Sequence, residues 1–214
     1  MHKPRVLLAD DHALIIEGFK RILEDRYELV GSAPDGRALI ESAKTLQPDI
    51  IILDVSMPLL NGIDAATHIK KLCPMTKLIF VTMHADTEYV RSAFEAGAAA
   101  YVLKRSAVDE LEQAIRAVLS GHSYITPLIT KDLLTVFLAA PSERASDAGA
   151  LTGRQKEVLQ LLAEGRTAKD IANVLKISPR TVEFHKGQIL EQLHLENTAD
   201  LIKYALTHGI VTPT

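Results

Sequence analysis

The fold of this chain is decided by the stretch Asp49-Ile50-Ile51-Ile52-Leu53-Asp54-Val55-Ser56-Met57-Pro58. Its four consecutive large apolar residues, three of them isoleucine, predict a strand that is buried on both faces, as in the centre of a parallel sheet. Asp54 ends this strand, at the edge where open α/β sheets collect ligands and reactive groups. The stretch therefore predicts both a parallel sheet and a functional carboxylate at its carboxyl edge.

Strand–helix alternation extends from this stretch in both directions, from Arg5 to about Leu119. Short apolar runs are separated by amphipathic helical patterns, which predicts a parallel sheet with helices on both faces. We expect a five-stranded, doubly wound α/β domain over residues 1–122. The predicted strands are 5–9, 27–32, 50–54, 77–82 and 100–103, and the predicted helices are 12–24, 36–46, 61–72, 87–96 and 107–119.

The last third of the chain has a helical pattern throughout. Ser178 precedes Pro179 as a helix cap precedes a proline at the first helical position. Only Lys176 and Ile177 separate this helix from the shorter one before it, which predicts a helix-turn-helix. We expect an all-α domain over residues 148–214. The predicted helices are 153–164, 168–175, 179–193 and 198–208.

Two further helices are expected to begin with a capping box, in which a hydroxyl and a carboxylate three residues later satisfy each other's backbone amides. Ser106 with Asp109 and Thr167 with Asp170 have this spacing.

Composition narrows the class of protein. The 214 residues are 47% hydrophobic, enough for a folded core, and carry a net charge of −3. The single cysteine, Cys73, fits a reducing compartment. There is no signal-peptide pattern and no apolar stretch near the roughly 18 residues that span a bilayer, so we expect a cytoplasmic protein without a membrane partner. Residues 123–147 are interpreted as a linker, because their second half is small and polar.

Polar residues follow several of the predicted strands at the same edge of the sheet. Asp10 and Asp11 follow the first strand, Asp54 ends the third, Thr82 ends the fourth and Lys104 follows the fifth. Converging carboxylates repel each other unless a cation compensates, and Mg²⁺ prefers oxygen ligands. A carboxylate beside such an ion can attack phosphorus to form an aspartyl phosphate. Lys104 and Thr82 would then contact the phosphoryl oxygens.

Residues 3–122 resemble the receiver domain of bacterial two-component response regulators, which has the CheY-like fold. The matching segments are Ala9-Asp10-Asp11-His12, Leu53-Asp54-Val55-Ser56-Met57-Pro58 with Gly62, Val81-Thr82-Met83-His84, and Ala96-Gly97-Ala98 running to Tyr101-Val102-Leu103-Lys104. The resemblance implies Asp54 as the phosphoacceptor, with a sensor histidine kinase as the donor. It implies Mg²⁺ ligands from Asp10, Asp11, Asp54 and the backbone carbonyl of Ser56. Thr82 and Tyr101 match the switch hydroxyl and the switch aromatic residue.

A phosphatase of the haloacid dehalogenase type would also place a nucleophilic aspartate after a buried strand. That family carries a second acid two residues later, where this chain has Ser56, and no other general acid is evident. We therefore expect a phosphoryl acceptor that turns over no external substrate, rather than an enzyme.

The second domain is similar to the LuxR-type helix-turn-helix of the NarL/FixJ class of response regulators, over about residues 148–212. The matching segments are Leu151-Thr152-Gly153-Arg154-Gln155-Lys156-Glu157-Val158-Leu159, Gly165-Arg166-Thr167-Ala168-Lys169-Asp170-Ile171-Ala172 and Ile177-Ser178-Pro179-Arg180-Thr181-Val182-Glu183-Phe184-His185. Gly153 stands where that class often has proline, and Phe184 where a small or polar residue is more usual. The resemblance implies binding of double-stranded DNA.

Helix 179–193 is the expected recognition helix, with Val182, Ile189, Leu190 and Leu193 on its buried stripe. Arg180, Lys186 and His185 are placed to reach phosphates, and Glu183 to accept from a cytosine amine. The candidate DNA contacts are Arg180, Thr181, Glu183, His185, Lys186 and Gln188.

The combined prediction is a DNA-binding transcriptional regulator that is switched by phosphorylation of Asp54 and forms a homodimer when phosphorylated. The alternative is a receiver that acts through protein or RNA interaction, with the helical domain as a dimerisation unit. Salt-dependent, sequence-specific DNA binding separates the two hypotheses.

Overall fold

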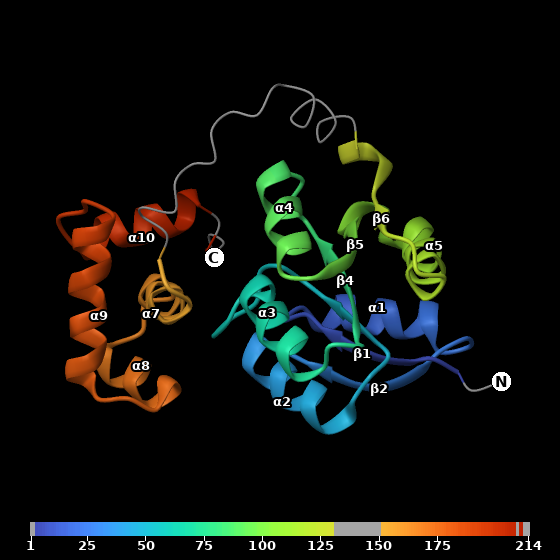
Figure 1. Ribbon diagram of the computed structural model, residues 1–214, viewed down its shortest axis with the longest axis horizontal. Helices are drawn as coiled ribbons and strands as arrows, with labels where there is room; N and C mark the ends of the chain where they lie inside the picture. Colours follow the sequence, from blue (N-terminus) through green and yellow to red (C-terminus); the bar gives the residue numbers. More distant parts are fainter. Residues whose placement is uncertain (1–2, 131–150, 209, 212–214) are drawn as a thin grey trace. The chain divides into compact units, whose positions relative to one another are not determined.

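The computed structural model of the chain describes residues 3–130, 151–208 and 210–211 (Figure 1). It separates the chain into two compact units, Met1–Ala140 and Pro141–Thr214. Residues 131–147 of the predicted linker lie outside the described residues. Among the helices that are described, none is long and apolar enough to cross a membrane.

The first unit is built on a parallel sheet of six strands in the order β2-β1-β3-β4-β5-β6. The five predicted strands are present, with bounds that shift by at most two residues. The expectation of five strands was one short, because Tyr124 and Ile125 pair with Ala100 and Tyr101 as a sixth strand too brief to show a period. The strands are β1 Arg5–Ala9, β2 Glu28–Ala33, β3 Ile50–Leu53, β4 Lys77–Thr82, β5 Ala98–Leu103 and β6 Tyr124–Ile125.

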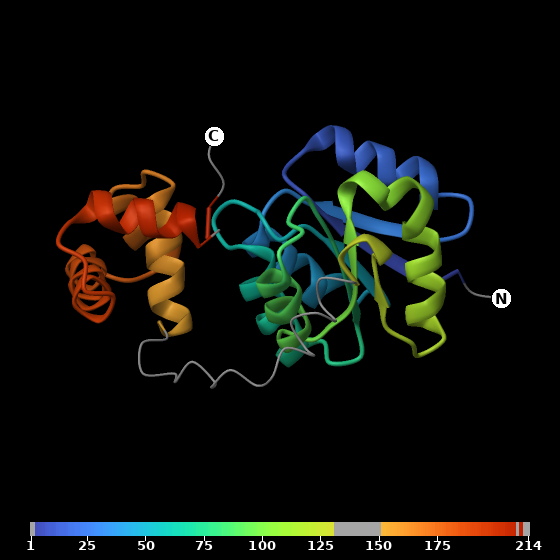
Figure 2. The ribbon, with the colours of Figure 1, turned by 90° about the horizontal axis from the view of Figure 1, so that it is seen from above.

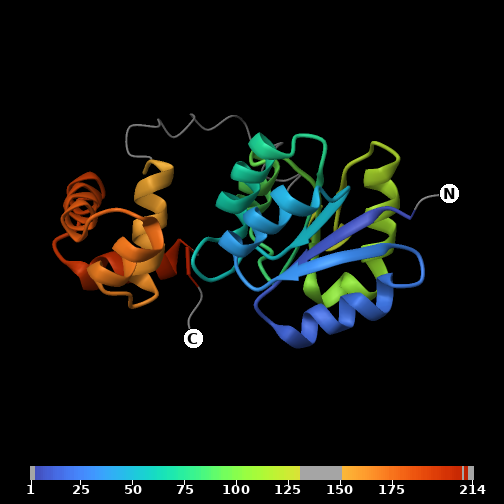
Figure 3. The ribbon, with the colours of Figure 1, turned by 90° about the horizontal axis from the view of Figure 1, so that it is seen from below.

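Helices cover both faces of this sheet, as the doubly wound pattern predicts (Figures 2 and 3). The central strand β3 alternates between two apolar cores: Ile50 and Ile52 pack on the side of α1 and α5, whereas Ile51 and Leu53 pack on the side of α2, α3 and α4. All four side chains are buried, so the strand is apolar on both faces. The helices are α1 Ala13–Leu23, α2 Gly36–Leu46, α3 Gly62–Leu72, α4 Thr87–Glu95 and α5 Ala107–Leu119.

The start of α3 is pressed against the loop that follows β3. The amide of Gly62 donates to the carbonyl of Val55 at 2.7 Å. A Cβ atom at Gly62 would lie 1.9 Å from the carbonyl oxygen of Asp54. Glycine at this position therefore lets the helix approach the end of β3 and helps to hold Asp54 at the sheet edge.

The second unit is helical, with α7 Gly153–Ala163, α8 Ala168–Leu175, α9 Pro179–Gln192 and α10 Thr198–Thr207. Thr167 and Asp170 form the predicted capping box at the start of α8. Ser178 caps α9 by accepting from the amide of Thr181 at 3.1 Å. Ser106 differs from the prediction: it makes no side-chain cap bond in the described structure, because a 3₁₀ turn over Lys104–Ser106 leads into α5.

Replacing Gly62 by alanine tests this close approach. Gly62→Ala should lower the free energy of unfolding of the first unit by about 1–3 kcal/mol, because the new methyl group overlaps rigid backbone. Gly18→Ala is the matched control: Gly18 lies in the middle of α1 and is exposed. Apart from its chain neighbours and the backbone of α1, no described atom lies within 4 Å of its Cβ position. This control should raise the free energy by about 0.5–1 kcal/mol. Urea unfolding measures both, and changes of the same sign would contradict the prediction.

Candidate functional site

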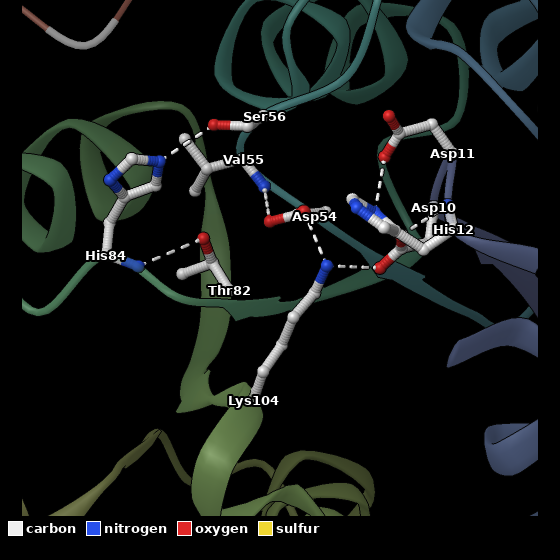
Figure 4. Close-up of polar contacts among 9 residues, drawn as sticks. All are labelled: Asp10, Asp11, His12, Asp54, Val55, Ser56, Thr82, His84 and Lys104. Carbon is white, nitrogen blue, oxygen red and sulfur yellow. Dashed lines mark hydrogen bonds and ion pairs between the residues drawn. The ribbon is translucent and has the colours of Figure 1, made fainter. Parts of the chain in front are cut away.

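Asp54 lies directly after β3 at the carboxyl edge of the sheet, and only 4% of its surface is exposed. Its Oδ2 atom lies 2.7 Å from the Nζ atom of Lys104, and its Oδ1 accepts from the amide of Val55 at 2.6 Å (Figure 4). A buried carboxylate is stable only when charges or hydrogen bonds compensate it, and both are present here.

Lys104 joins Asp54 to a second buried carboxylate. Its Nζ atom also lies 2.7 Å from Oδ2 of Asp10, which follows β1 (Figure 4). Burial disfavours the charged ammonium, but the attraction of Asp54 and Asp10 outweighs it, so the pKa of Lys104 is raised. One ammonium thus draws together the ends of β1, β3 and β5.

His12 holds the other side of the acidic pair. Its Nδ1 atom lies 3.0 Å from Oδ1 of Asp10 and 2.8 Å from Oδ1 of Asp11, and its backbone amide donates to Asp10 at 2.9 Å. The ligand atoms of these three residues all lie within 4.8 Å of one another. The carboxylate oxygens form a donor set of the kind that Mg²⁺ prefers.

His84, in the loop after β4, connects the remaining predicted residues. Its Nε2 atom lies 2.7 Å from Oγ of Ser56, and its ring stacks on Tyr89 with the ring centroids 4.2 Å apart. Its backbone amide donates to Oγ1 of Thr82 at 3.4 Å, and its carbonyl accepts from the hydroxyl of Tyr101 at 3.0 Å. Burial lowers the pKa of His84, against the opposing attraction of nearby carboxylates. The contacts with Ser56 and Tyr101 are not visible in the sequence pattern, because these partners lie 28 and 17 residues from His84 along the chain.

Tyr101 lies inside the first unit, on β5. Its side chain is fully buried, and its ring lies 6.3 Å from that of Phe80, measured between centroids. Burial raises the pKa of its phenol, and Asp54 adds to the shift. The ring is therefore held inward by packing and by the single described hydrogen bond to the carbonyl of His84.

The sheet thus brings the predicted residues to one edge. Asp10, Asp54 and Lys104 are joined directly, and Asp11 joins them through His12. Ser56, Thr82 and Tyr101 form a second group around His84.

In the second unit, α9 exposes some of the predicted DNA contacts more than others. Arg180, Glu183 and Gln188 are exposed, whereas Thr181, His185 and Lys186 are half-buried. The Nζ atom of Lys186 lies 3.9 Å from Oε2 of Glu183. Of the predicted buried stripe, Val182 and Ile189 are fully buried, and Leu190 and Leu193 are only partly so.

Comparison with known families agrees with this architecture. Residues 6–116 match the family described as the response regulator receiver domain. Residues 149–205 match the family described as bacterial regulatory proteins of the luxR type. Fold and site thus define a receiver followed by a helix-turn-helix domain. The chain belongs to the NarL/FixJ-type response regulators, which have this domain order.

Named relatives have the same organisation along nearly their whole length. The transcriptional regulatory protein MctR of Rhizobium johnstonii is 36% identical over 213 residues, covering 98% of this chain and 96% of that protein. The oxygen regulatory protein NreC of Staphylococcus carnosus is 36% identical over 209 residues, covering 94% and 96%.

The fold is also similar to those of solved response regulators. RcsB of Salmonella typhimurium superposes with a TM-score of 0.66 at 28% identity, covering 99% of this chain and all of that one. The RcsB–DNA complex superposes with a TM-score of 0.60 at 27% identity, with the same coverage. The chain is thus a DNA-binding response regulator, and the alternative of a helical domain used only for dimerisation is disfavoured.

The burial of Tyr101 predicts a pH-dependent stability. In the unfolded chain the phenol ionises near its ordinary pKa of about 10, but the folded state holds it neutral. Above pH 10 the unfolded state therefore binds fewer protons than the folded state, and stability falls as pH rises. Tyr101→Phe should cost about 1 kcal/mol at pH 8 through the lost hydrogen bond.

The difference between the two proteins should then shrink or reverse at pH 11, because the variant lacks this ionisation. Ionisation of Tyr101 in the unfolded state can lower the free energy of unfolding of the parent by up to about 1.4 kcal/mol per pH unit, and the variant lacks this contribution. Urea unfolding at both pH values measures the difference. A difference that stays constant would show that Tyr101 ionises equally easily in both states.

Proposed function

We propose that Asp54 accepts a phosphoryl group from a sensor histidine kinase, and that this modification switches DNA binding by the second unit. The observation that carries the proposal is the position of the Lys104 ammonium, 2.7 Å from the carboxylates of both Asp54 and Asp10. It supplies a buried positive charge beside a buried nucleophile. We assign residues 1–122 to the receiver, 123–147 to the linker and 148–214 to the DNA-binding domain.

In the transfer step, a carboxylate oxygen of Asp54 attacks the phosphorus of a phosphohistidine. The new O–P bond forms as the P–N bond breaks, and the electron pair of that bond returns to the imidazole nitrogen of the donor. Lys104 exchanges its contact with Asp54 for one with a phosphoryl oxygen. Because Asp54 keeps the group until it is lost by hydrolysis, no external substrate is turned over.

Asp10, Asp11, Asp54 and the carbonyl of Ser56 would hold Mg²⁺. The fit rests on the donors: three carboxylates meet at one edge, where the two most buried now share a single ammonium. A bound Mg²⁺ supplies positive charge that offsets the repulsion between these carboxylates and an incoming phosphoryl group.

Thr82 and Tyr101 would transmit the change through His84. A phosphoryl oxygen would accept from the Thr82 hydroxyl and draw it toward Asp54, away from the amide of His84 that donates to it. The carbonyl of His84 accepts from Tyr101, so this movement would reach Tyr101. Such a change shifts an existing equilibrium by as much as the phosphoryl group favours one state.

For DNA, α9 would enter the major groove, with Arg180, His185 and Lys186 at phosphates and Thr181, Glu183 and Gln188 toward bases. The solved RcsB relatives include a complex with DNA and one of two dimers on two parallel DNAs. They support double-stranded DNA as the partner and a homodimer as the DNA-binding form, and we propose that phosphorylation favours this homodimer. We place the protein in the cytoplasm, where a promoter and a kinase are both accessible.

Labelling with a radioactive small phosphodonor, such as acetyl phosphate with Mg²⁺, tests the acceptor. The parent should be labelled, and Asp54→Asn should not, because the amide keeps the shape but loses the nucleophile. Asp25→Asn is the matched control, because Asp25 is an exposed aspartate between α1 and β2, and it should be labelled like the parent.

Two further labelling experiments test whether Mg²⁺ is required. A chelator and Asp11→Ala should each strongly reduce labelling of the parent chain. Equal labelling of the parent and Asp54→Asn would refute the assignment of the acceptor, whereas labelling that survives the chelator would refute only the metal.

The salt dependence of DNA affinity tests α9. Arg180→Ala should weaken binding to all duplexes about equally and reduce the slope of log affinity against log salt by roughly one, because one phosphate contact is lost. Lys203→Ala removes the same charge from an exposed site on α10 and should leave the slope unchanged. A changed sequence preference with an unchanged slope would assign Arg180 to a base instead.

A further inference from the structure

The exposed side of α9 is a regular stripe along the helix. Its members are spaced three and four residues apart, so they lie on one face over three turns. The opposite face is anchored in the core by Val182 and Ile189, which are fully buried. The stripe consists of Arg180, Glu183, Phe184, Gly187, Gln188 and Glu191.

Phe184 is the large apolar member of this stripe, and 61% of it is exposed. Its described ring contact is with its neighbour His185, edge-on, with the centroids 5.9 Å apart. A single exposed apolar residue is common on protein surfaces, so exposure alone assigns nothing. The position is what distinguishes Phe184: it stands between Arg180 and Gln188, one turn from each, in the face that the proposed function directs into a DNA groove.

Gly187 stands on the same face, three residues after Phe184. Glycine in the interior of a helix lowers its stability relative to alanine. Apart from its two chain neighbours and the backbone of its own helix, no described atom lies within 4 Å of the position that a Cβ atom would take. The described part of the chain therefore offers no steric reason for glycine at 187.

The charges of the stripe also favour contact with bases rather than with phosphates. Of the six members of the stripe, Arg180 is cationic, whereas Glu183 and Glu191 are acidic. The six residues of the stripe themselves therefore offer little electrostatic attraction to phosphates, so contacts with base edges must contribute to their affinity for DNA. The apolar group that a base pair presents in the major groove is the 5-methyl group of thymine.

We propose that Phe184 packs against the 5-methyl group of a thymine in the major groove; this inference rests on the proposed DNA-binding function. Gly187 leaves room for the helix to approach that base. Phe184 thereby determines part of the sequence specificity. A phenyl ring has no hydrogen-bonding group, so it selects thymine through contact with the methyl group alone.

The test uses the full chain after treatment with acetyl phosphate and Mg²⁺. A preferred duplex is first selected from random sequences, and each thymine in it is then replaced by deoxyuridine, which removes the methyl group and keeps the base pairing. At one thymine of each half-site, the replacement should weaken binding about fourfold, the factor that corresponds to burying one methylene-sized group. Phe184→Ala should bind both duplexes equally, at about the affinity of the parent for the deoxyuridine duplex or more weakly.

Three variants sharpen the result. Gln188→Ala, in the same stripe, should lower affinity but keep the preference for thymine. Phe184→Leu should also keep it, because leucine retains an apolar contact. Gly187→Ala should raise the melting temperature and weaken DNA binding, because the added methyl group stabilises the helix and occupies the approach to the base.

The outcomes separate the proposal from the function on which it rests. If the parent selects no duplex, the proposed DNA binding fails. If it selects a duplex but is indifferent to every deoxyuridine, or if Phe184→Ala keeps the preference for thymine, the reading of a methyl group by Phe184 is wrong. Loss of the dimer in Phe184→Ala without DNA would assign the ring to a second copy of the chain instead. Unchanged DNA affinity in Gly187→Ala would overturn the role of the glycine.

Discussion

The structure of the first unit depends on compensating two buried carboxylates. Asp10 and Asp54 are both 4% exposed, and the ammonium of Lys104 lies 2.7 Å from each of them. A buried charge without a partner would destabilise the fold strongly, so the ends of β1, β3 and β5 have to meet at one edge. The pairing of Ala9 with Leu53 brings the first two strand ends together, and the order of the strands brings the third.

Contacts in the surrounding loops also hold the residues at this edge of the sheet. Gly62 lets α3 begin against the carbonyl of Asp54, and His84 ties the loop after β4 to Ser56 and Thr82. The backbone carbonyl of His84 also accepts a hydrogen bond from the hydroxyl of Tyr101, which is buried in the core. These hydrogen bonds connect the loop after β3 with the end of β4 and with Tyr101 on β5, and we propose that a charge added at Asp54 acts on them.

In the first unit the proposed phosphoacceptor is buried, whereas in the second unit the proposed DNA contacts are exposed or half-buried. Capping boxes begin α7 (Thr152 with Gln155) and α8 (Thr167 with Asp170), and Val182 and Ile189 anchor α9 in the core. The face of α9 that we propose for DNA binding remains exposed. On that face Phe184 is exposed and its described ring contact is with its neighbour His185, and Gly187 is exposed as well. We attribute both residues to a partner, and a DNA groove fits both the shape of a helix and the matched family.

The sequence by itself determined the elements and most of the residues at the sheet edge. Ile50–Leu53 predicted a strand buried on both faces, and Thr167 with Asp170 predicted a capping box, because such signals depend on neighbours along the chain. Tertiary structure alone decided the strand β6 and the contact of His84 with Ser56. The physical reason is that local periodicity and capping act over a few residues, whereas these pairings arise only when segments far apart in the sequence are packed together.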